Sequence, residues 1–162
     1  MARMERKSAP STGKMLGCTC MRLRKASRRV SQIYDHSLEA VGMTVTQYGV
    51  LGHIAKFDGV GIGVLAEKLT MDPTTLTRNL RPLERQGFVA MRPDRRDKRS
   101  RCLHLTASGR AAFESAKPAW MRAQRRVQEA LGGSEAAALN AALDRFLERL
   151  ADQRSVGEKR AE

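Results

Sequence analysis

The chain has 162 residues and a formal net charge of +13, with 30 Lys and Arg against 17 Asp and Glu. This length suits one domain with tails, and the charge predicts attraction to a polyanion. Aromatic residues make up only 4% of the chain, which argues against the base-stacking surfaces that bind single-stranded nucleic acid and RNA. Among polyanions, duplex DNA is therefore favoured.

Membrane and secreted classes are not favoured. No apolar run approaches the roughly 20 residues of a membrane span, and the basic first residues lack the apolar segment of a secretory signal. Three cysteines, Cys18, Cys20 and Cys102, are too few for a disulfide scaffold. We therefore expect a cytoplasmic protein without a membrane partner.

Two segments are expected before the central part of the chain. Residues 1–17 predict a mobile basic tail. A helix is expected within residues 18–43, beginning at about Thr19, because Leu23, Ala26, Val30 and Ile33 are spaced three and four residues apart. Gly42 is expected to end this helix. The opposite face of this helix is basic and carries Arg22, Arg24, Lys25, Arg28 and Arg29.

A lobe of short elements is expected over residues 44–106. Thr44 and Gln47 have capping-box spacing, which starts a helix. The Gly-rich stretch 58–63 lacks a preceding strand and a complete G-x-G-x-x-G, so it predicts a connector and not a phosphate loop. A short helix over about 63–69 follows. Asp72 and Pro73 then supply an N-cap and a first-turn proline for the next helix, which Pro82 should bend.

The lobe ends in a predicted wing, and two long helices follow. Strand-like runs 88–92 and 101–105 flank a polar basic tip, which is typical of a β-hairpin. Residues 107–151 predict two helices, the first capped by Thr106 and kinked or broken at Pro118, the second capped by Ser134. Residues 152–162 predict a frayed polar tail.

The short helix, turn and following helix indicate a helix-turn-helix whose second helix enters the major groove. Arg78 suits a guanine edge and Asn79 an adenine edge, while threonine hydroxyls and methyls suit phosphates and thymine. Polar residues on one helix are commonly just its solvated surface, and the adjacent basic hairpin favours the DNA-binding interpretation. The candidate DNA-contacting residues of the helix are Thr74, Thr75, Thr77, Arg78 and Asn79.

The hairpin tip has its own candidate role. An arginine there fits a narrow minor groove, where the negative potential is strongest, and the alternative is a solvated charged loop. The tip residues are Arg95, Arg96, Asp97, Lys98 and Arg99.

The segments TQYGVLGHIA, VLAEKLTMDPTTLTRNLRPLERQGFV and LHLTASGRAAF, with a D-x-R-D-x-R wing between the last two, resemble the MarR family. The resemblance implies a mainly α fold with a small β-hairpin wing: a winged helix-turn-helix with N- and C-terminal dimerisation helices. It implies a homodimer on a palindromic operator, usually a repressor released by a small ligand or by oxidation. The apolar stripes expected at the dimer interface are Val30, Leu139, Leu143, Phe146, Leu147 and Leu150.

Two triggers remain open. Cys20 matches the reactive cysteine of peroxide-sensing members and Tyr34 a supporting tyrosine, but Arg24 and Val45 replace two others. Cys18 is a second candidate, and an inert packed cysteine is the alternative. The other trigger is a small aromatic acid lined by Tyr48, His53 and Trp120, residues that equally suit the core.

An enzyme is not expected. The three histidines are scattered without metal-ligand spacing, and no hydrolase, metalloprotease or P-loop motif occurs. Neither a cofactor nor a metal is therefore predicted. The alternatives to a DNA-binding regulator are a basic protein associated with RNA or the ribosome, and an interaction adaptor that no longer binds DNA.

Overall fold

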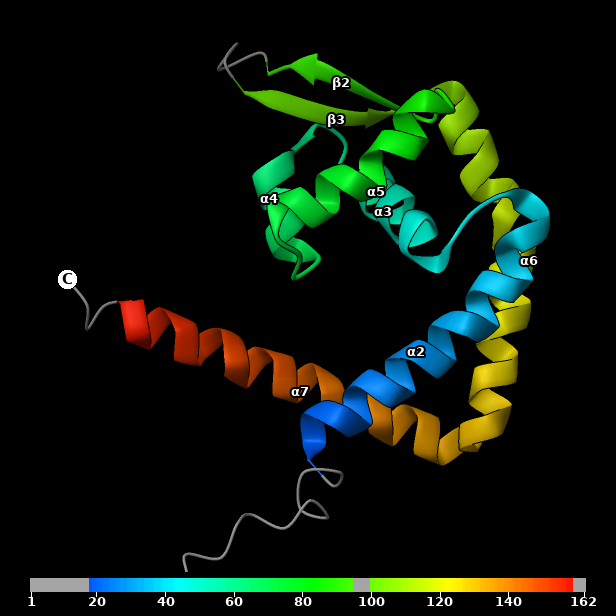
Figure 1. Cartoon of the computed structure of the whole chain (residues 1–162), viewed down its shortest axis with the longest axis vertical. Coiled ribbons are helices and arrows are strands. Elements are labelled where there is room, and N and C mark those ends of the chain that lie inside the picture. Colours follow the sequence, from blue (N-terminus) through cyan, green and yellow to red (C-terminus); the bar gives the residue numbers. More distant parts are fainter. Residues whose placement is uncertain (1–17, 95–99, 159–162) are drawn as a thin grey trace, which may run out of the picture.

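The computed structural model describes residues 18–94 and 100–158. Side chains are described only as far as Asp152. A lobe of short helices and a small sheet lies at one end of the long helix α6, and α2 and α7 lie toward its other end (Figure 1). The elements are α2 (Thr19–Leu38), η1 (Glu39–Val41), α3 (Val45–Lys56), β1 (Val60–Gly61), α4 (Ile62–Lys68), α5 (Pro73–Arg85), β2 (Val89–Pro93), β3 (Arg101–Leu105), α6 (Ala107–Leu131) and α7 (Gly133–Glu158).

Local capping signals start the helices as expected. The Thr44 hydroxyl accepts from the Gln47 amide at 3.2 Å, and the Gln47 side chain accepts from the Thr44 amide at 2.9 Å, which confirms the capping box. Asp72 Oδ1 accepts from the Thr75 amide at 2.8 Å at the start of α5. Gly42 has φ 66° and ends the first helical segment. This left-handed conformation is one that glycine adopts without strain.

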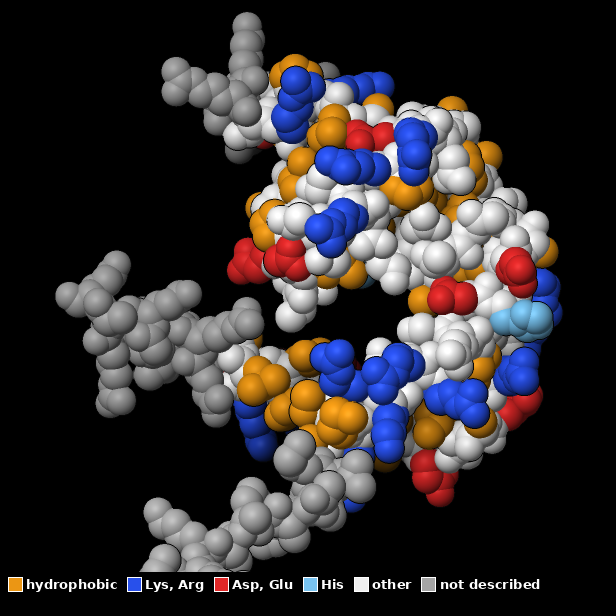
Figure 2. Space-filling model, viewed as in Figure 1, with side chains coloured by type: hydrophobic (Ala, Val, Ile, Leu, Met, Phe, Trp, Pro, Cys, Tyr) orange, Lys and Arg blue, Asp and Glu red, His pale blue; other side chains and the backbone are white. Residues whose placement is uncertain are grey.

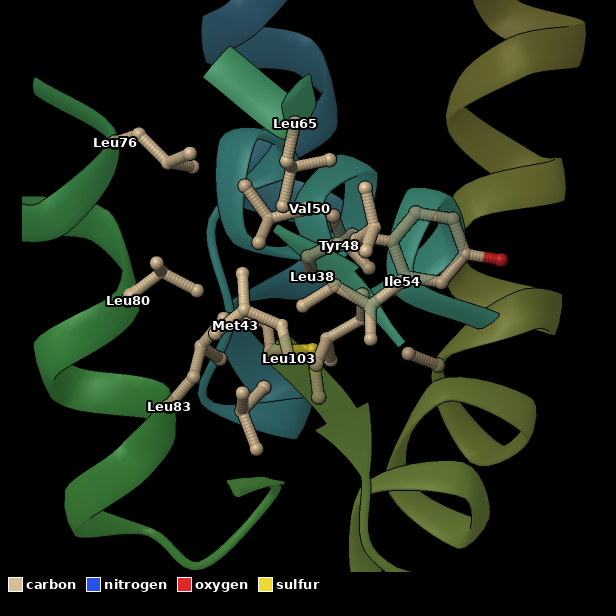
Figure 3. Packing of buried hydrophobic residues seen from close by; sticks show 14 of the residues in the cluster. Leu38, Met43, Tyr48, Val50, Ile54, Leu65, Leu76, Leu80, Leu83 and Leu103 are labelled. Atoms are coloured by element: carbon tan, nitrogen blue, oxygen red, sulfur yellow. The ribbon is translucent and has the colours of Figure 1, made fainter. Parts of the chain in front are cut away.

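The hydrophobic core lies inside the lobe (Figure 3). Leucines and other apolar side chains of α2, α3, α4, α5 and β3 are fully buried there, each stabilising the fold by about 1.5–3 kcal/mol. The largest of them are Leu38, Val50, Leu51, Ile54, Leu65, Leu76, Leu80, Leu83 and Leu103. From α6, Ala116 and Ala119 close this core, so that helix holds the lobe and the arm together.

The sheet has a strand that the sequence did not predict. Its order is β1-β3-β2, and both pairings are antiparallel. Val60 is the register partner of Leu103, and the Gly59 amide donates to the Leu103 carbonyl at 3.1 Å. The expected connector over 58–63 therefore contributes an edge strand, because burying Val60 against β3 outweighs the absence of any local strand pattern.

The two interior prolines do not break their helices. Of the kink or break expected at Pro118, the break is wrong, since α6 runs without interruption from Ala107 to Leu131, and α5 likewise contains Pro82. Pro118 is exposed, so water can satisfy the carbonyl that its missing N–H leaves free.

The last helix also differs from expectation. Ser134 lies inside α7, and its hydroxyl donates to Glu135 Oε2 at 2.7 Å instead of capping the helix. The helix continues to Glu158, past the point at which fraying was expected. No helix in the described part of the chain combines the length and the apolar character that crossing a membrane demands.

Candidate nucleic-acid interface

A tight turn sets the direction of α5 after α4. Thr70 in this turn has φ 52°, and the Met71 amide donates to the Ala66 carbonyl at 2.8 Å. Leu65 of α4 and Leu76 of α5 are both fully buried beside this turn. The turn and this packing hold α5 with its opposite face toward solvent.

One row of polar side chains on α5 is open to solvent. Thr74, Thr77, Arg78 and Arg81, together with Pro73, line one shallow hollow along the helix. Both arginines are exposed, and among the described residues neither forms an ion pair with a carboxylate. Their guanidinium groups are therefore available to an anion. Arg81 was not among the sequence candidates, although its i+3 spacing from Arg78 places it on the same row.

Three of the candidates on α5, including Thr77 of this row, are bonded to their own helix. The Thr75 hydroxyl donates to Asp72 Oδ2 at 2.5 Å, the Thr77 hydroxyl to the Pro73 carbonyl at 2.7 Å, and the Asn79 amide to the Thr75 carbonyl at 2.9 Å. The two hydrogen bonds from Thr75 hold the pKa of Asp72 below its ordinary value. Thr75 and Asn79 thus lie on a flank of the helix whose side-chain orientation is fixed internally.

The β2–β3 hairpin leads away from the lobe beside α5 (Figure 1). Pro93 pairs with Arg101 at its outer end, and the Asp94 amide donates to the Ser100 carbonyl at 2.9 Å. Arg92 and Arg101 are exposed on this stem, and Figure 2 shows Lys and Arg side chains gathered over this end of the lobe. The predicted tip residues Arg95, Arg96, Asp97, Lys98 and Arg99 lie outside the described residues.

The cysteine candidates lie at the start of α2. Cys18 is its N-cap, and its Sγ accepts from the Met21 amide at 3.4 Å. Both Cys18 and Cys20 are exposed. Tyr34 is buried in the second half of the helix and donates its hydroxyl to Gln124. Since an α-helix rises by about 1.5 Å per residue, Tyr34 lies about 21 Å along the axis from Cys20. One chain therefore does not bring Cys20 and Tyr34 together.

Cys102 has a different environment. It is buried in β3, and its Sγ donates to Asp94 Oδ2 at 3.3 Å. Burial raises the pKa of the Cys102 thiol, and the hydrogen bond to Asp94 and its charge act in the same direction.

The residues expected to line a ligand pocket are packed. Tyr48 stacks on Phe113 with ring centroids 4.7 Å apart and on Trp120 at 5.9 Å. Burial raises the pKa of Tyr48, and the charge of Glu114 adds to this effect. His53 Nδ1 lies 2.8 Å from the Gly49 carbonyl of its own helix. The structure thus joins Tyr48 and Trp120 in an aromatic cluster that fills space between α3 and α6.

An apolar stripe on α7 faces solvent. Leu139, Phe146, Leu147 and Leu150 are each 41–53% exposed, and Leu143 is half-buried. On α2, Val30 is 36% exposed. Orange side chains on the lower arm in Figure 2 mark apolar surface of this kind. In the described part of one chain α7 packs mainly on α6, and the stripe stays exposed.

Comparison with known proteins places this geometry in a family. The sequence model of the MarR family matches residues 41–100, which contain the helix-turn-helix and the first wing strand. The transcriptional regulator MosR of M. tuberculosis, in a structure in complex with DNA, is 34% identical, with a TM-score of 0.65 over 80% of this chain and 98% of that one. The chain belongs to the MarR family.

Other MarR-type proteins agree. The transcriptional repressor CouR, bound to a 23-mer DNA duplex, gives a TM-score of 0.76 at 27% identity over 86% of this chain and 99% of that one. The transcriptional activatory protein BadR of Rhodopseudomonas palustris is 35% identical. The match covers 57% of this chain and 55% of BadR. These relatives are transcription regulators and not enzymes, and the predicted winged helix-turn-helix fold is confirmed.

Proposed function

We propose that this MarR-family chain is a homodimeric transcription regulator that binds duplex DNA at a palindromic operator. In this proposal α5 lies in the major groove and the β2–β3 wing lies against the minor groove. The observation that carries it is the exposed row of Thr74, Thr77, Arg78 and Arg81, whose two guanidinium groups have no carboxylate partner among the described residues. The DNA-bound structures of MosR and CouR support it.

The chemistry of the row suits base reading. An arginine guanidinium bonds the O6 and N7 atoms of guanine with two parallel hydrogen bonds, which discriminates by about 1–3 kcal/mol against another base. Arg78 and Arg81 lie on the same face, so one can bond a base while the other bonds a phosphate. At the wing, Arg99 and Arg96 are the proposed minor-groove residues, with Asp97 orienting an arginine through a bidentate pair.

The dimer is proposed from the apolar stripe on α7 and from Val30 on α2. Four large apolar side chains of α7 remain 41–53% exposed in one chain. Apolar surface of this kind costs free energy in water, and a second copy would cover it. A two-fold dimer of this kind reads half-sites about 34–36 Å apart.

We propose a repressor that an effector releases. The effector is either an oxidant acting on Cys20 or Cys18, or a small aromatic acid. The exposure of both thiols supports the oxidant, because peroxide must reach the sulfur. Packing of Tyr48 between Phe113 and Trp120 argues against an aromatic acid at that place unless the cluster opens.

The test of operator binding uses genomic fragments that include the promoter of the gene itself. Arg78→Ala should weaken binding to the selected operator by about 1–3 kcal/mol and relax preference at one base pair. Arg110→Ala, at an exposed position on α6, is the matched control and should change little. Equal loss on all sequences would refute a base contact by Arg78, and failure to select any fragment would refute the function.

The trigger is tested on the same fragments with reduced protein, peroxide-treated protein and protein with benzoate as probe. Loss of binding with peroxide that Cys20→Ser or Cys18→Ser abolishes and Cys102→Ser does not would support the thiol trigger. Loss with benzoate alone would support the aromatic acid. Binding that neither treatment changes would refute release by both.

A further inference from the structure

Most of the positive charge lies outside the DNA-reading lobe. Residues 1–29 contain nine Lys and Arg and one acidic residue, Glu5, for a net charge of +8. Residues 44–106, with α5 and the wing, contain eleven basic and six acidic residues, for a net charge of +5. An operator held by α5 and the wing therefore leaves the larger share of the charge unexplained.

Within the described residues this charge lies on α2, and all of it except Arg24 lies along one row of that helix. Arg22, Lys25 and Arg29 follow each other at i, i+3 and i+7, which aligns them along the helix, and Arg28 lies beside them. The apolar residues Leu23, Ala26 and Val30 lie on the adjoining side of the helix, where Ala26 is four residues after Arg22 and three before Arg29. All residues from 22 to 30 are exposed. We call Arg22, Lys25, Arg28 and Arg29 the α2 basic face.

No carboxylate neutralises this face within the described chain. The described residues form three ion pairs, and none of them involves this face: His36–Glu39, His104–Asp58 and Lys117–Glu114. The one acidic residue of α2, Asp35, accepts from the Val45 amide at 2.7 Å, near the other end of the helix. Arg29 contacts a neutral group, Gln32 Oε1, at 3.5 Å. Four cations close together, with no carboxylate partner among the described residues of one chain, are electrostatically unfavourable until an anion binds them.

The face lies far from the recognition surface. The first half of α2 lies at the opposite end of the molecule from β2 and β3 (Figure 1). Its buried residues, Tyr34 and Leu38, both belong to the second half of the helix. Figure 2 shows Lys and Arg side chains over the lower arm, separated from those over the lobe. A duplex bound by α5 and the wing does not reach them.

We propose that the α2 basic face binds the phosphate backbone of a second DNA duplex, so that one dimer holds two segments of DNA at once. From residue 22 to residue 29 the helix advances about 10 Å, at about 1.5 Å per residue. This length covers about three phosphates of one strand, which follow each other at about 3.4 Å along the duplex axis. Guanidinium groups bind phosphate oxygens in a bidentate manner. The contact reads no bases and therefore holds DNA of any sequence.

The residues present favour a duplex over other polyanions. The exposed half of α2 contains no aromatic side chain on which single-stranded bases would stack. An interfacial membrane helix needs large apolar side chains opposite its basic face. The apolar residues of this half of α2 are only Leu23, Ala26 and Val30, which lie beside the basic face and not opposite it, and Val30 belongs to the surface proposed for the dimer. A rigid row of cations with no aromatic neighbour and few large apolar ones fits a duplex backbone best.

The test counts duplexes per dimer. The full chain is mixed with a 20-bp duplex of random sequence at low salt, and the complexes are measured by sedimentation. The variant Arg22→Gln/Lys25→Gln/Arg29→Gln keeps a good helix former at exposed positions. The control Arg122→Gln/Arg125→Gln/Arg126→Gln removes the same charge from exposed positions of α6.

Wild type and the α6 control should bind one more duplex per dimer than the α2 variant. The affinity of wild type for this additional duplex should fall as salt rises. On a log–log plot of affinity against salt, contacts to three phosphates should contribute a slope of about −2.7, at 0.9 for each phosphate, and the α2 variant should lack this contribution. An unchanged duplex count in the α2 variant would overturn the proposal, as would an equal loss in the α6 control. Binding to phosphatidylserine vesicles that the α2 variant loses, with its duplex count unchanged, would overturn it in favour of a membrane.

This test is independent of operator recognition, because its probe has a random sequence. Operator affinity of the α2 variant measured in parallel should remain within twofold of wild type when compared at 0.2 M salt. If no operator is ever selected but the α2 variant still loses a duplex, the proposed function fails and the second DNA surface stands. If the operator is bound and the duplex count does not change, only the second surface fails.

Discussion

Replacing Gly109 by Ala should disrupt the junction between the recognition lobe and α6. A Cβ atom at this position would lie 1.9 Å from the Phe88 carbonyl oxygen and 2.7 Å from its carbonyl carbon. Real Cβ contacts are essentially never shorter than 3.0 Å, so the two backbones must separate by about 1.1 Å. Both atoms belong to the backbone, and no side-chain rotation relieves the contact.

The cost follows from the hydrogen bonds that this separation breaks. The Thr106 amide donates to the Phe88 carbonyl at 3.1 Å, and the Thr106 and Ser108 hydroxyls donate to the Gly87 carbonyl at 2.6 and 2.9 Å. At a net value of about 1 kcal/mol each, their loss amounts to about 3 kcal/mol. That is a large part of the roughly 5–15 kcal/mol by which native proteins are usually stable.

Urea unfolding followed by circular dichroism measures this loss, at one fixed protein concentration because dimerisation contributes to apparent stability. Gly49→Ala is the matched control, since Gly49 lies inside α3 with no atom within 4 Å of an added Cβ. This control should gain about 0.5–1 kcal/mol. A Gly109→Ala variant within about 1 kcal/mol of wild type would refute the reasoning, because α6 would then move without losing these hydrogen bonds.

Thr70 has φ 52°, a strained conformation for a β-branched residue. Thr70→Gly should therefore raise the free energy of unfolding by about 0.5–1 kcal/mol, which urea unfolding checks. The lowered pKa of Asp72 means that its stabilising effect is complete above the ordinary Asp range and disappears as pH falls through the folded-state pKa. Acid unfolding of wild type should therefore be steeper than that of Asp72→Asn, and equal curves would contradict this. Leu147→Glu should weaken dimerisation at least tenfold in sedimentation, whereas Ala138→Glu on another face of α7 should not. At neutral pH, Cys102 should react more slowly with a thiol reagent than the two exposed cysteines, and three equal rates would contradict its burial.

The helices were predictable from the sequence because their determinants are local. Thr44 with Gln47, and Asp72 with Pro73, act within one helical turn, so spacing alone identifies them. Strand β1 was not predictable in the same way. Val60 gains its partner Leu103 only when the chain has folded, 43 residues later in sequence. The need for Gly109 is also non-local, since the sequence shows only a glycine near a helix start, and the Phe88 carbonyl supplies the reason.

The sequence also does not show which candidate DNA-contacting side chains are free to reach a base. Residue types alone treat every polar side chain of α5 as a free donor or acceptor. In the structure the N-cap Asp72 bonds the Thr75 hydroxyl, and the Thr75 carbonyl in turn bonds the Asn79 amide.

The residue that starts α5 therefore also limits which of its side chains can turn toward a base. To reorient its amide toward an adenine edge, Asn79 must first give up a hydrogen bond worth about 1 kcal/mol. Arg78 and Arg81 have no such bond to lose among the described residues. Discrimination by this helix should consequently depend more on the two arginines than on Asn79, and the arginine that sequence reasoning omitted shares the exposed row with the one that it named.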